Sequence, residues 1–183
     1  MGLRWCGLAA LAALLLSCAT APEHDAGAAD SGLGAGAEDA GADAGSRAPY
    51  ADVVAVNVSG AGPFTFAVAI ESSDTGCAQY ADWWEVLSED GALLYRRTLG
   101  HSHTDDNGTT DPGAPGNTFT RSGGPVDAAA SDTVIVRAHL HPAGYVGRAM
   151  RGSVEDGFEA FTPAADFATE LADAPPQPPA CAF

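Results

Sequence analysis

The sequence predicts an all-β domain, an antiparallel β-sandwich, and three observations support this fold class. Hydrophobic and polar residues alternate with a period of two in three separate segments, as they do in strands that cover a shared core. An Asp-Gly pair between two β-forming runs is typical of a tight hairpin. Glycine and proline, with 22 and 12 of the 183 residues, favour turns and disfavour long helices.

Residues 1–17 are expected to be a signal peptide. Arg4 is their only charged residue, and the apolar run 8–16 is shorter than the roughly 20 residues needed to span a bilayer. Positions 15–18 read Leu-Leu-Ser-Cys, which resembles the lipobox of bacterial lipoproteins. The resemblance implies that Cys18 becomes the lipid-modified first residue of a protein anchored in the cell envelope. Ala19 in place of Asp implies outer-membrane sorting, and ordinary secretory cleavage near Ala19 or Ala21 is the alternative.

Residues 18–48 are expected to form a disordered tether. Between positions 19 and 48, 17 of 30 residues are Ala or Gly, six are acidic, and Leu33 is the only large aliphatic residue. Such a segment cannot bury enough apolar surface to offset its ordering entropy. A flexible chain of this length would hold the folded domain roughly 30 Å from a membrane surface.

Residues 49–183 are expected to contain the sandwich domain and a proline-rich C-terminal tail. The first strand is predicted to place Val54, Val56 and Val58 on its core face. A turn at residues 60–63 leads into a second strand with the most regular alternation. Its predicted core residues are Phe64, Phe66, Val68 and Ile70.

The run WWEVLSEDGALLYRRTL at positions 83–99 predicts a β-hairpin. If Asp90 and Gly91 form a two-residue type I′ turn, the register follows by counting outward from the turn. The predicted opposite pairs are Val86 with Tyr95, Glu85 with Arg96, and Trp84 with Arg97.

The two faces of this hairpin are expected to differ. Trp84, Val86, Leu93 and Tyr95 are predicted to face the core. The opposite face is predicted to carry a solvated Glu85–Arg96 ion pair, contributing less than about 1 kcal/mol, beside Trp83, Leu87 and Leu94. Two readings of Trp83 stay open, namely cover by the C-terminal tail and exposure for a sugar or protein ligand.

Further strands are expected around Phe119, between residues 150 and 161 as a hairpin, and at a segment with core residues Val134, Val136, Ala138 and Leu140. Seven or so short strands with few helices resemble an immunoglobulin-like or fibronectin-type sandwich, with a jelly roll as the alternative. A second resemblance covers residues 74–157, including GCAQYADWWEVLSEDGALLYRRTLGHSH, FTRSGGPV, VIVRAH and GYVGRA. These runs are similar to a group of small exported bacterial proteins that has no assigned activity.

The charge balance excludes one class of partner. Against 24 acidic residues stand eight arginines and no lysine, which gives a formal net charge of −16. Such a chain is repelled by nucleic acid, so no nucleic-acid partner is expected. The expected partners are the membrane, through lipid on Cys18, and an unidentified envelope protein or ligand.

Two of the four cysteines remain for the folded domain. Removal of Cys6 with the signal peptide and lipidation of Cys18 leave Cys77 and Cys181. Two cysteines in an exported domain are expected to pair, which predicts a Cys77–Cys181 disulfide. A catalytic thiol is the alternative, although no basic residue flanks either cysteine closely.

Four histidines occur as two His-x-His pairs, His101 with His103 and His139 with His141. On a strand, residues i and i+2 point the same way, so each pair offers two imidazoles to one ion. Together with Asp105 they are candidate ligands of a zinc or copper ion, and no other cofactor is expected. Local hydrogen bonding of the histidines in polar loops is the alternative.

These observations favour a non-enzymatic, membrane-anchored envelope lipoprotein whose β-sandwich has a binding or structural role. No phosphate-binding glycine loop and no G-x-S-x-G motif occurs in the sequence, and no catalytic residues are predicted. The alternative is a small metal-binding hydrolase or redox protein that uses the paired histidines.

Overall fold

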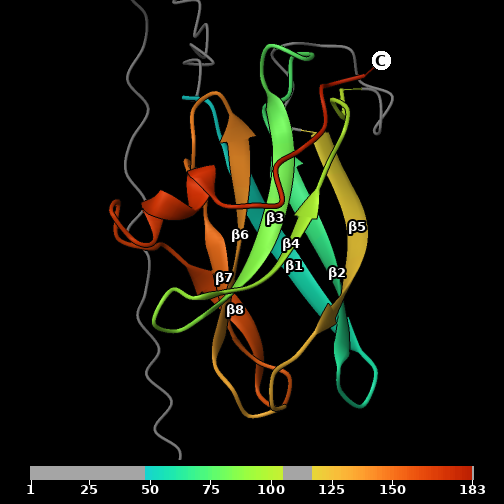
Figure 1. Ribbon diagram of the computed structural model, residues 1–183, viewed down its shortest axis with the longest axis vertical. Helices are drawn as coiled ribbons and strands as arrows, with labels where there is room; N and C mark the ends of the chain where they lie inside the picture. The colour runs from blue at the N-terminus through green and yellow to red at the C-terminus, as the bar shows by residue number, and fades with distance from the viewer. Residues whose placement is uncertain (1–47, 105–116, 183) are drawn as a thin grey trace, which may run out of the picture. The chain divides into compact units, whose positions relative to one another are not determined.

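The computed structural model describes residues 48–104 and 117–182, and these form two antiparallel β-sheets packed face to face (Figure 1). The predicted signal peptide, nearly all of the predicted tether, Cys18 and Asp105 lie outside the described residues. The elements are β1 (Ala51–Ser59), β2 (Phe64–Ser72), β3 (Tyr80–Ser88), β4 (Leu93–Thr98), β5 (Asn117–Val126), β6 (Val134–His141), β7 (Ala149–Ser153), β8 (Gly157–Phe161) and the 3-10 helix η1 (Thr169–Asp173).

The strand order confirms the predicted sandwich of the immunoglobulin or fibronectin type. One sheet has the order β1-β2-β5 and the other β4-β3-β6-β7-β8. The first, second and fifth strands thus share a sheet, and the third, sixth and seventh share the other, as strands A, B, E and C, F, G do in immunoglobulin folds. A jelly roll, the alternative, would need a different pairing of strands.

The main core lies between the two sheets, as the alternating segments predicted. Phe66, Val68, Ile70 and Val136 are almost completely buried there, together with Trp84. The first strand differs from its prediction. A shift in the β1–β2 register between Val53 and Ala55 places Val53, rather than Val54, in the buried cluster. Such a bulge moves the following side chains to the other face of the strand.

The hairpin of β3 and β4 has the predicted register. Trp84 lies opposite Arg97, Glu85 opposite Arg96 and Val86 opposite Tyr95. The turn itself differs, because Gly91 has a φ of 90° while Asp90 keeps a negative φ. A type I′ turn needs a positive φ at both positions, so the chain uses a different tight turn closed by the Gly91 N–H and the Ser88 carbonyl, 3.0 Å apart.

A register shift next to this turn reverses the predicted faces of two leucines. The β3–β4 pairing slips between Val86 and Leu87, so that Leu87 lies opposite Leu93. Leu93 therefore packs with Leu87 on the outer side of the sheet, and Leu94 packs against the main core. The sequence predicted the opposite assignment, because the count from the turn assumed no extra residue.

The outer face of the five-stranded sheet is also buried. Leu87, Ile135 and Ala149 form a second, smaller apolar cluster there, and it is contacted by residues of the chain's last part, including Phe167 and Leu171. We call residues 162–182 the C-terminal segment. Figure 1 shows it, in red, crossing β6 and β3. Trp83 is buried on this face, so an exposed Trp83 is wrong.

Candidate functional site

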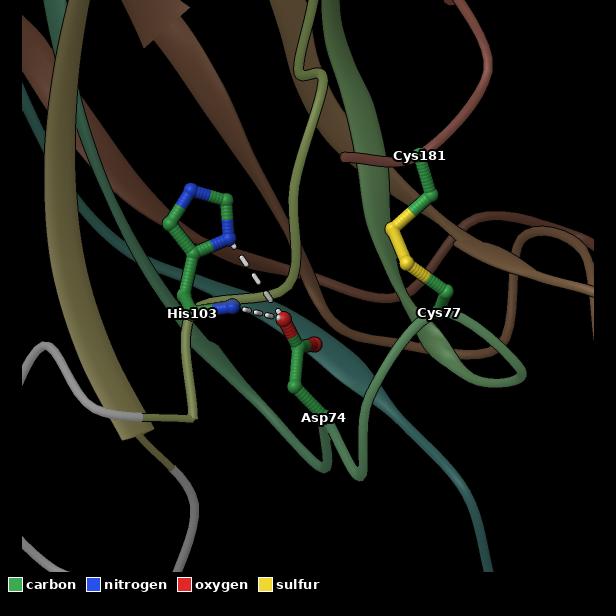
Figure 2. The surroundings of a disulfide bond; sticks show 4 residues. All are labelled: Asp74, Cys77, His103 and Cys181. Atoms are coloured by element: carbon green, nitrogen blue, oxygen red, sulfur yellow. Dashed lines mark hydrogen bonds and ion pairs between the residues drawn. A yellow bond between two sulfur atoms is a disulfide. The ribbon is translucent and has the colours of Figure 1, made fainter. Parts of the chain in front are cut away.

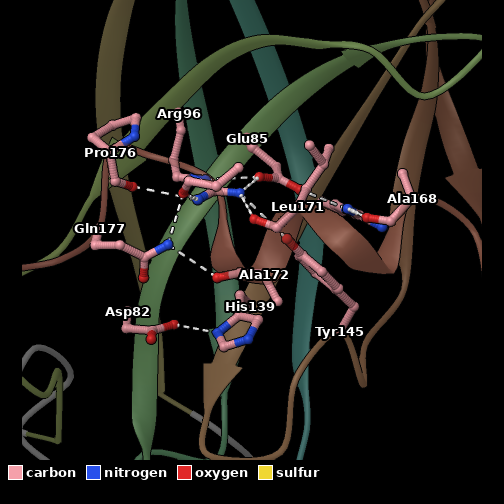
Figure 3. A network of polar contacts seen from close by, with 12 residues as sticks. Asp82, Glu85, Arg96, His139, Tyr145, Ala168, Leu171, Ala172, Pro176 and Gln177 are labelled. Carbon is pink, nitrogen blue, oxygen red and sulfur yellow. Dashed lines mark hydrogen bonds and ion pairs between the residues drawn. The ribbon is translucent and has the colours of Figure 1, made fainter.

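The outer face of the five-stranded sheet carries a layer of charged and aromatic side chains beneath the C-terminal segment (Figure 3). Alternate residues of β3, β4 and β6 point to this face, because side chains in a strand alternate between its two sides. The residues concerned are Trp83 and Glu85 of β3, Arg96 of β4, and Arg137 and His139 of β6.

Glu85 lies at the centre of this layer and is completely buried. Its Oε2 accepts hydrogen bonds from Nη2 and Nε of Arg96 at 2.6 and 2.9 Å, and its Oε1 accepts one from Nε of Arg137 at 2.8 Å. The expectation of a solvated Glu85–Arg96 pair is therefore wrong. The C-terminal segment returns over the hairpin and excludes water from the pair.

The two arginines use their remaining N–H groups to hold the C-terminal segment. Arg96 donates to the backbone carbonyls of Leu171 and Ala174, both at 2.5 Å. Arg137 donates to the carbonyls of Phe167 and Ala168 at 2.6 and 2.8 Å. One carboxylate thus orients two guanidinium groups, and these bind backbone oxygens rather than side chains of the segment.

Aromatic rings complete the layer. The Trp83 and His139 rings are stacked with centroids 3.7 Å apart, and Arg96 lies over Trp83 at 4.6 Å. Arg137 lies 3.5 Å from the centre of the Tyr145 ring, within the usual range of a cation–π contact. Burial, together with the negative charge of Glu85, raises the pKa of the Tyr145 phenol to about 12, although the two arginines oppose this shift.

His139 is held by a carboxylate on the neighbouring strand. Its Nδ1 lies 2.6 Å from Oδ1 of Asp82, which fixes the orientation of the ring against Trp83. A metal site that uses both His139 and His141 requires both imidazoles to be accessible. His141 is exposed, but His139 is buried because Trp83 and Tyr145 pack against it.

His103 lies in a second buried polar cluster (Figure 2). It is 1% exposed, its ring is stacked on Phe119 at 3.6 Å, and its Nδ1 is 3.4 Å from Oδ2 of Asp74. Within the part of the chain that the structure describes, neither ring nitrogen has a hydrogen-bond partner.

Asp74 organises this second cluster. Its carboxylate accepts hydrogen bonds from the backbone N–H of His103 at 2.8 Å, from the hydroxyl of Ser72 at 2.7 Å and from the N–H of Ala81 at 2.9 Å. Burial alone would raise the pKa of Asp74, but these bonds and the His103 side chain outweigh it and lower the pKa.

The predicted zinc or copper ligands are only partly brought together. The His101 and His103 rings lie 4.6 Å apart, and His139 is paired with a different carboxylate. Across residues 48–104 and 117–182, no group of three or more His, Cys, Asp or Glu side chains is arranged to hold a metal ion. Asp105 lies outside the described residues, so the metal site stays a prediction.

The two cysteines left for the folded domain are joined in the structure (Figure 2). Cys77 precedes β3, Cys181 lies near the end of the C-terminal segment, and their Cα atoms are 5.6 Å apart. The Ala182 N–H also donates to the Gly100 carbonyl at 2.8 Å. The last part of the segment is therefore fixed both covalently and by a backbone hydrogen bond.

Sequence reasoning missed Asp74, Asp82, Arg137 and Tyr145 as members of these clusters. Arg137 lies directly opposite Glu85 in the β3–β6 pairing, although 52 residues separate them in the sequence. The alternation of β6 did place Arg137 on the outer face. Only the pairing of β3 with β6, which no local signal specifies, reveals its partner.

Comparison with known proteins gives one similarity. The chain is 37% identical over 109 residues to a protein of Halomicrobium mukohataei named "Putative lipoprotein". The match covers 58% of this chain and 49% of that protein, so the chain spans about half the length of the relative it matches. No family model matches the sequence, and no solved structure matches it. Among the described residues, no helix has the length and apolarity required to cross a membrane.

Proposed function

We propose that the protein is a lipid-anchored protein of the cell envelope, attached through Cys18, that presents a β-sandwich with a binding or structural role. The observation that carries this proposal is the similarity to a protein with a lipoprotein name, beside the Leu-Leu-Ser-Cys motif at positions 15–18. Two or more acyl chains suffice for stable anchoring, because each buried CH2 group contributes about 0.8 kcal/mol.

The arrangement of the outer face supports a binding or structural role. Glu85, Arg96 and Arg137 satisfy one another and the backbone of the C-terminal segment. Their charges are therefore used to hold the chain in place. A rigid sandwich with a fixed terminal segment suits a domain that is displayed on a tether.

Metabolic labelling with palmitate tests the anchor. Wild-type chain expressed in a bacterial host is expected to incorporate the label and to accumulate as an unprocessed precursor when globomycin is present. Cys18→Ser is expected to abolish labelling. Cys6→Ser is the matched control, because it removes a cysteine from the same segment and is expected to label normally. A wild-type protein that is unlabelled and freely secreted would refute the proposal.

We place the anchored protein in the outer membrane, because Ala19 rather than Asp follows the cysteine. Separation of inner and outer membranes by density is expected to recover the wild-type chain with the outer membrane. Ala19→Asp is expected to move it to the inner membrane while palmitate labelling is unchanged. Recovery of both proteins from the same fraction contradicts this assignment.

A further inference from the structure

The C-terminal segment lies on the outer face of the sheet in the manner of a bound peptide. Residues 167–171 contact β6 and the apolar cluster beside it, and Ala174 and Pro176 reach Arg96 on β4. Within the described chain the segment contains one short 3-10 helix and contributes no strand to either sheet. It is therefore held by side chains of the face rather than by a β-ladder.

Most of the polar contacts between the face and the segment are hydrogen bonds to backbone carbonyls of the segment. Arg96 binds the carbonyls of Leu171, Ala174 and Pro176, the last at 3.3 Å, and Arg137 binds two carbonyls more. A backbone carbonyl is common to every peptide. The same N–H groups can therefore be satisfied by any chain that presents its oxygens at a similar spacing.

The sequence of the segment indicates which peptides fit. Residues 174–180 read Ala-Pro-Pro-Gln-Pro-Pro-Ala, and proline has no N–H group that would be left without a partner on this face. Pro179 packs against Gly100, where an added Cβ would come within 3.3 Å of the Pro179 ring. Proline-rich segments are commonly bound by surfaces that carry aromatic side chains, and Arg96, which binds the carbonyls of Ala174 and Pro176, lies over the Trp83 ring.

The binding groups are fixed in advance of the segment. Glu85 holds both guanidinium groups through contacts of 2.6 and 2.8 Å that do not involve the segment. One carboxylate neutralises one of the two charges, so the pair of arginines keeps a net positive charge directed at the carbonyls. Groups fixed in this way lose little freedom when a peptide binds.

The two halves of the segment are retained by different forces. Phe167 and Leu171 are packed into the apolar cluster with Leu87 and Ile135. Residues 174–182 have two of the three Arg96 contacts, to Ala174 and Pro176, the hydrogen bond from Ala182 to Gly100, and the disulfide of Cys181. The disulfide therefore fixes the proline-rich half only, and breaking it leaves the contacts of Phe167 and Leu171 in place.

We propose that the outer face around Trp83 and Arg96 binds a proline-rich peptide in trans, in competition with residues 174–182, and that the Cys77–Cys181 disulfide decides this competition. A dithiol reductant donates two electrons to the disulfide, the S–S bond breaks, both sulfurs are protonated as thiols, and the dithiol is oxidised to its own disulfide. The inference rests on the proposed binding role but not on the lipid at Cys18.

The released residues still compete, because a short tether keeps them at an effective concentration of about millimolar. The test therefore uses a full-length variant whose own segment is weakened, Pro175→Gly, Pro176→Gly and Cys181→Ser together. These changes leave every residue of the binding face intact. Glycine raises the conformational entropy of the free segment and so favours its release.

The probe is a fluorescent peptide with the sequence of residues 174–180, and the readout is its anisotropy. We expect the weakened variant to bind the probe at least about tenfold more tightly than oxidised wild-type protein does, because its tethered competitor is weaker and is no longer linked to Cys77. Dithiol-reduced wild-type protein is expected to lie between the two. A control peptide with all four prolines replaced by alanine is expected to bind at least about tenfold more weakly.

Two further measurements make the result decisive. Reduction of the wild-type chain is expected to remove the hydrogen-exchange protection of the Ala182 amide while the amides of β3 and β6 stay protected. Equal binding of the proline and alanine peptides overturns the proposal. The proposal is also overturned if the probe binds neither the reduced wild-type chain nor the weakened variant, provided that the variant still melts cooperatively. Loss of palmitate labelling with probe binding retained would refute the lipid anchor alone.

Discussion

Substitution of Glu85 by glutamine tests the central claim about the outer face, namely that one buried carboxylate holds two buried arginines. Glu85→Gln keeps the shape and length of the side chain but removes its charge. Arg96 is itself 5% exposed and Arg137 3% exposed, so neither guanidinium group can turn to water for compensation without moving the C-terminal segment.

The expected loss is large. Removing one partner of a buried ion pair typically costs about 3–5 kcal/mol, because the remaining charge is left uncompensated in a region of low dielectric constant. Here two cations are left, and their mutual repulsion adds to the cost. At about 4 °C per kcal/mol for a domain of this size, the melting temperature is expected to fall by about 10–20 °C.

Glu89→Gln is the matched control. Glu89 is ion-paired with Arg151, but the two side chains are 58% and 38% exposed, and such surface pairs contribute under about 1 kcal/mol. Urea unfolding followed by tryptophan fluorescence, with the disulfide intact, gives the free energy of unfolding of all three proteins. If Glu85→Gln lies within 1 kcal/mol of the control, the buried carboxylate does not hold the arginines as described.

Four other predictions follow from the same contacts. The lowered pKa of Asp74 means that its ionised form stabilises the fold above the unfolded-state pKa of about 3.9, and this contribution is lost as pH falls through the lower folded-state pKa. The urea midpoint of Asp74→Asn should therefore fall less between pH 5 and 2 than that of wild type, and parallel curves would contradict this. The Tyr145 phenol, with a pKa of about 12 against 10 for an unshifted tyrosine, stabilises the fold fully below pH 10 and loses this effect by pH 12. Ultraviolet titration of Tyr145→Phe should accordingly lack the last phenol to ionise, and an unchanged final step would refute the shift. Zinc or copper is expected to raise the melting temperature. His101→Ala and His141→Ala, both at exposed positions, are expected to abolish the rise while the melting temperature of the metal-free protein changes little. The absence of any rise in the wild-type protein excludes the site. Reduction of the disulfide, which closes a separation of 104 residues, should lower the free energy of unfolding by about 4–5 kcal/mol in urea titrations, and equal stability of the two forms would show that it does not constrain the unfolded chain.

The parts of the fold that the sequence predicts are those in which a local pattern and the tertiary environment agree. Strand β2 buries the four residues that its alternation selects, because one face packs on the core and the other does not. The predicted pairs of β3 and β4 from Trp84 to Val86 are correct because the different turn and the bulge at Leu87 compensate for each other. The bulges near Val54 and Leu87 leave no comparable signal. The first replaces Val54 by Val53 in the core, and the second exchanges the faces of Leu93 and Leu94.

The candidate site was mispredicted for a different reason. The sequence predicts that Glu85 and Arg96 lie in solvent because both are on the outward face of the hairpin. The structure does place both residues on that face. Their burial depends on residues that lie 75 to 80 positions after Arg96 and return over the sheet. Hydrophobic periodicity within a strand reports only which side a residue takes. It carries no information on what later covers that side.

The charged layer gives the C-terminal segment a single position, which apolar packing alone would not. Phe167 and Leu171 could slide along the cluster around Leu87 and Ile135, because hydrophobic contact has no preferred direction. Hydrogen bonds to arginine are directional, and a shift of one residue would break most of them while leaving buried guanidinium groups unpaired. This supports a role for the layer in fixing one conformation of the segment. A buried ion pair often adds little net stability compared with apolar residues of similar size. It also follows that a segment held by its backbone oxygens is fixed in position without being unique in sequence, which is the property that lets a similar peptide replace it.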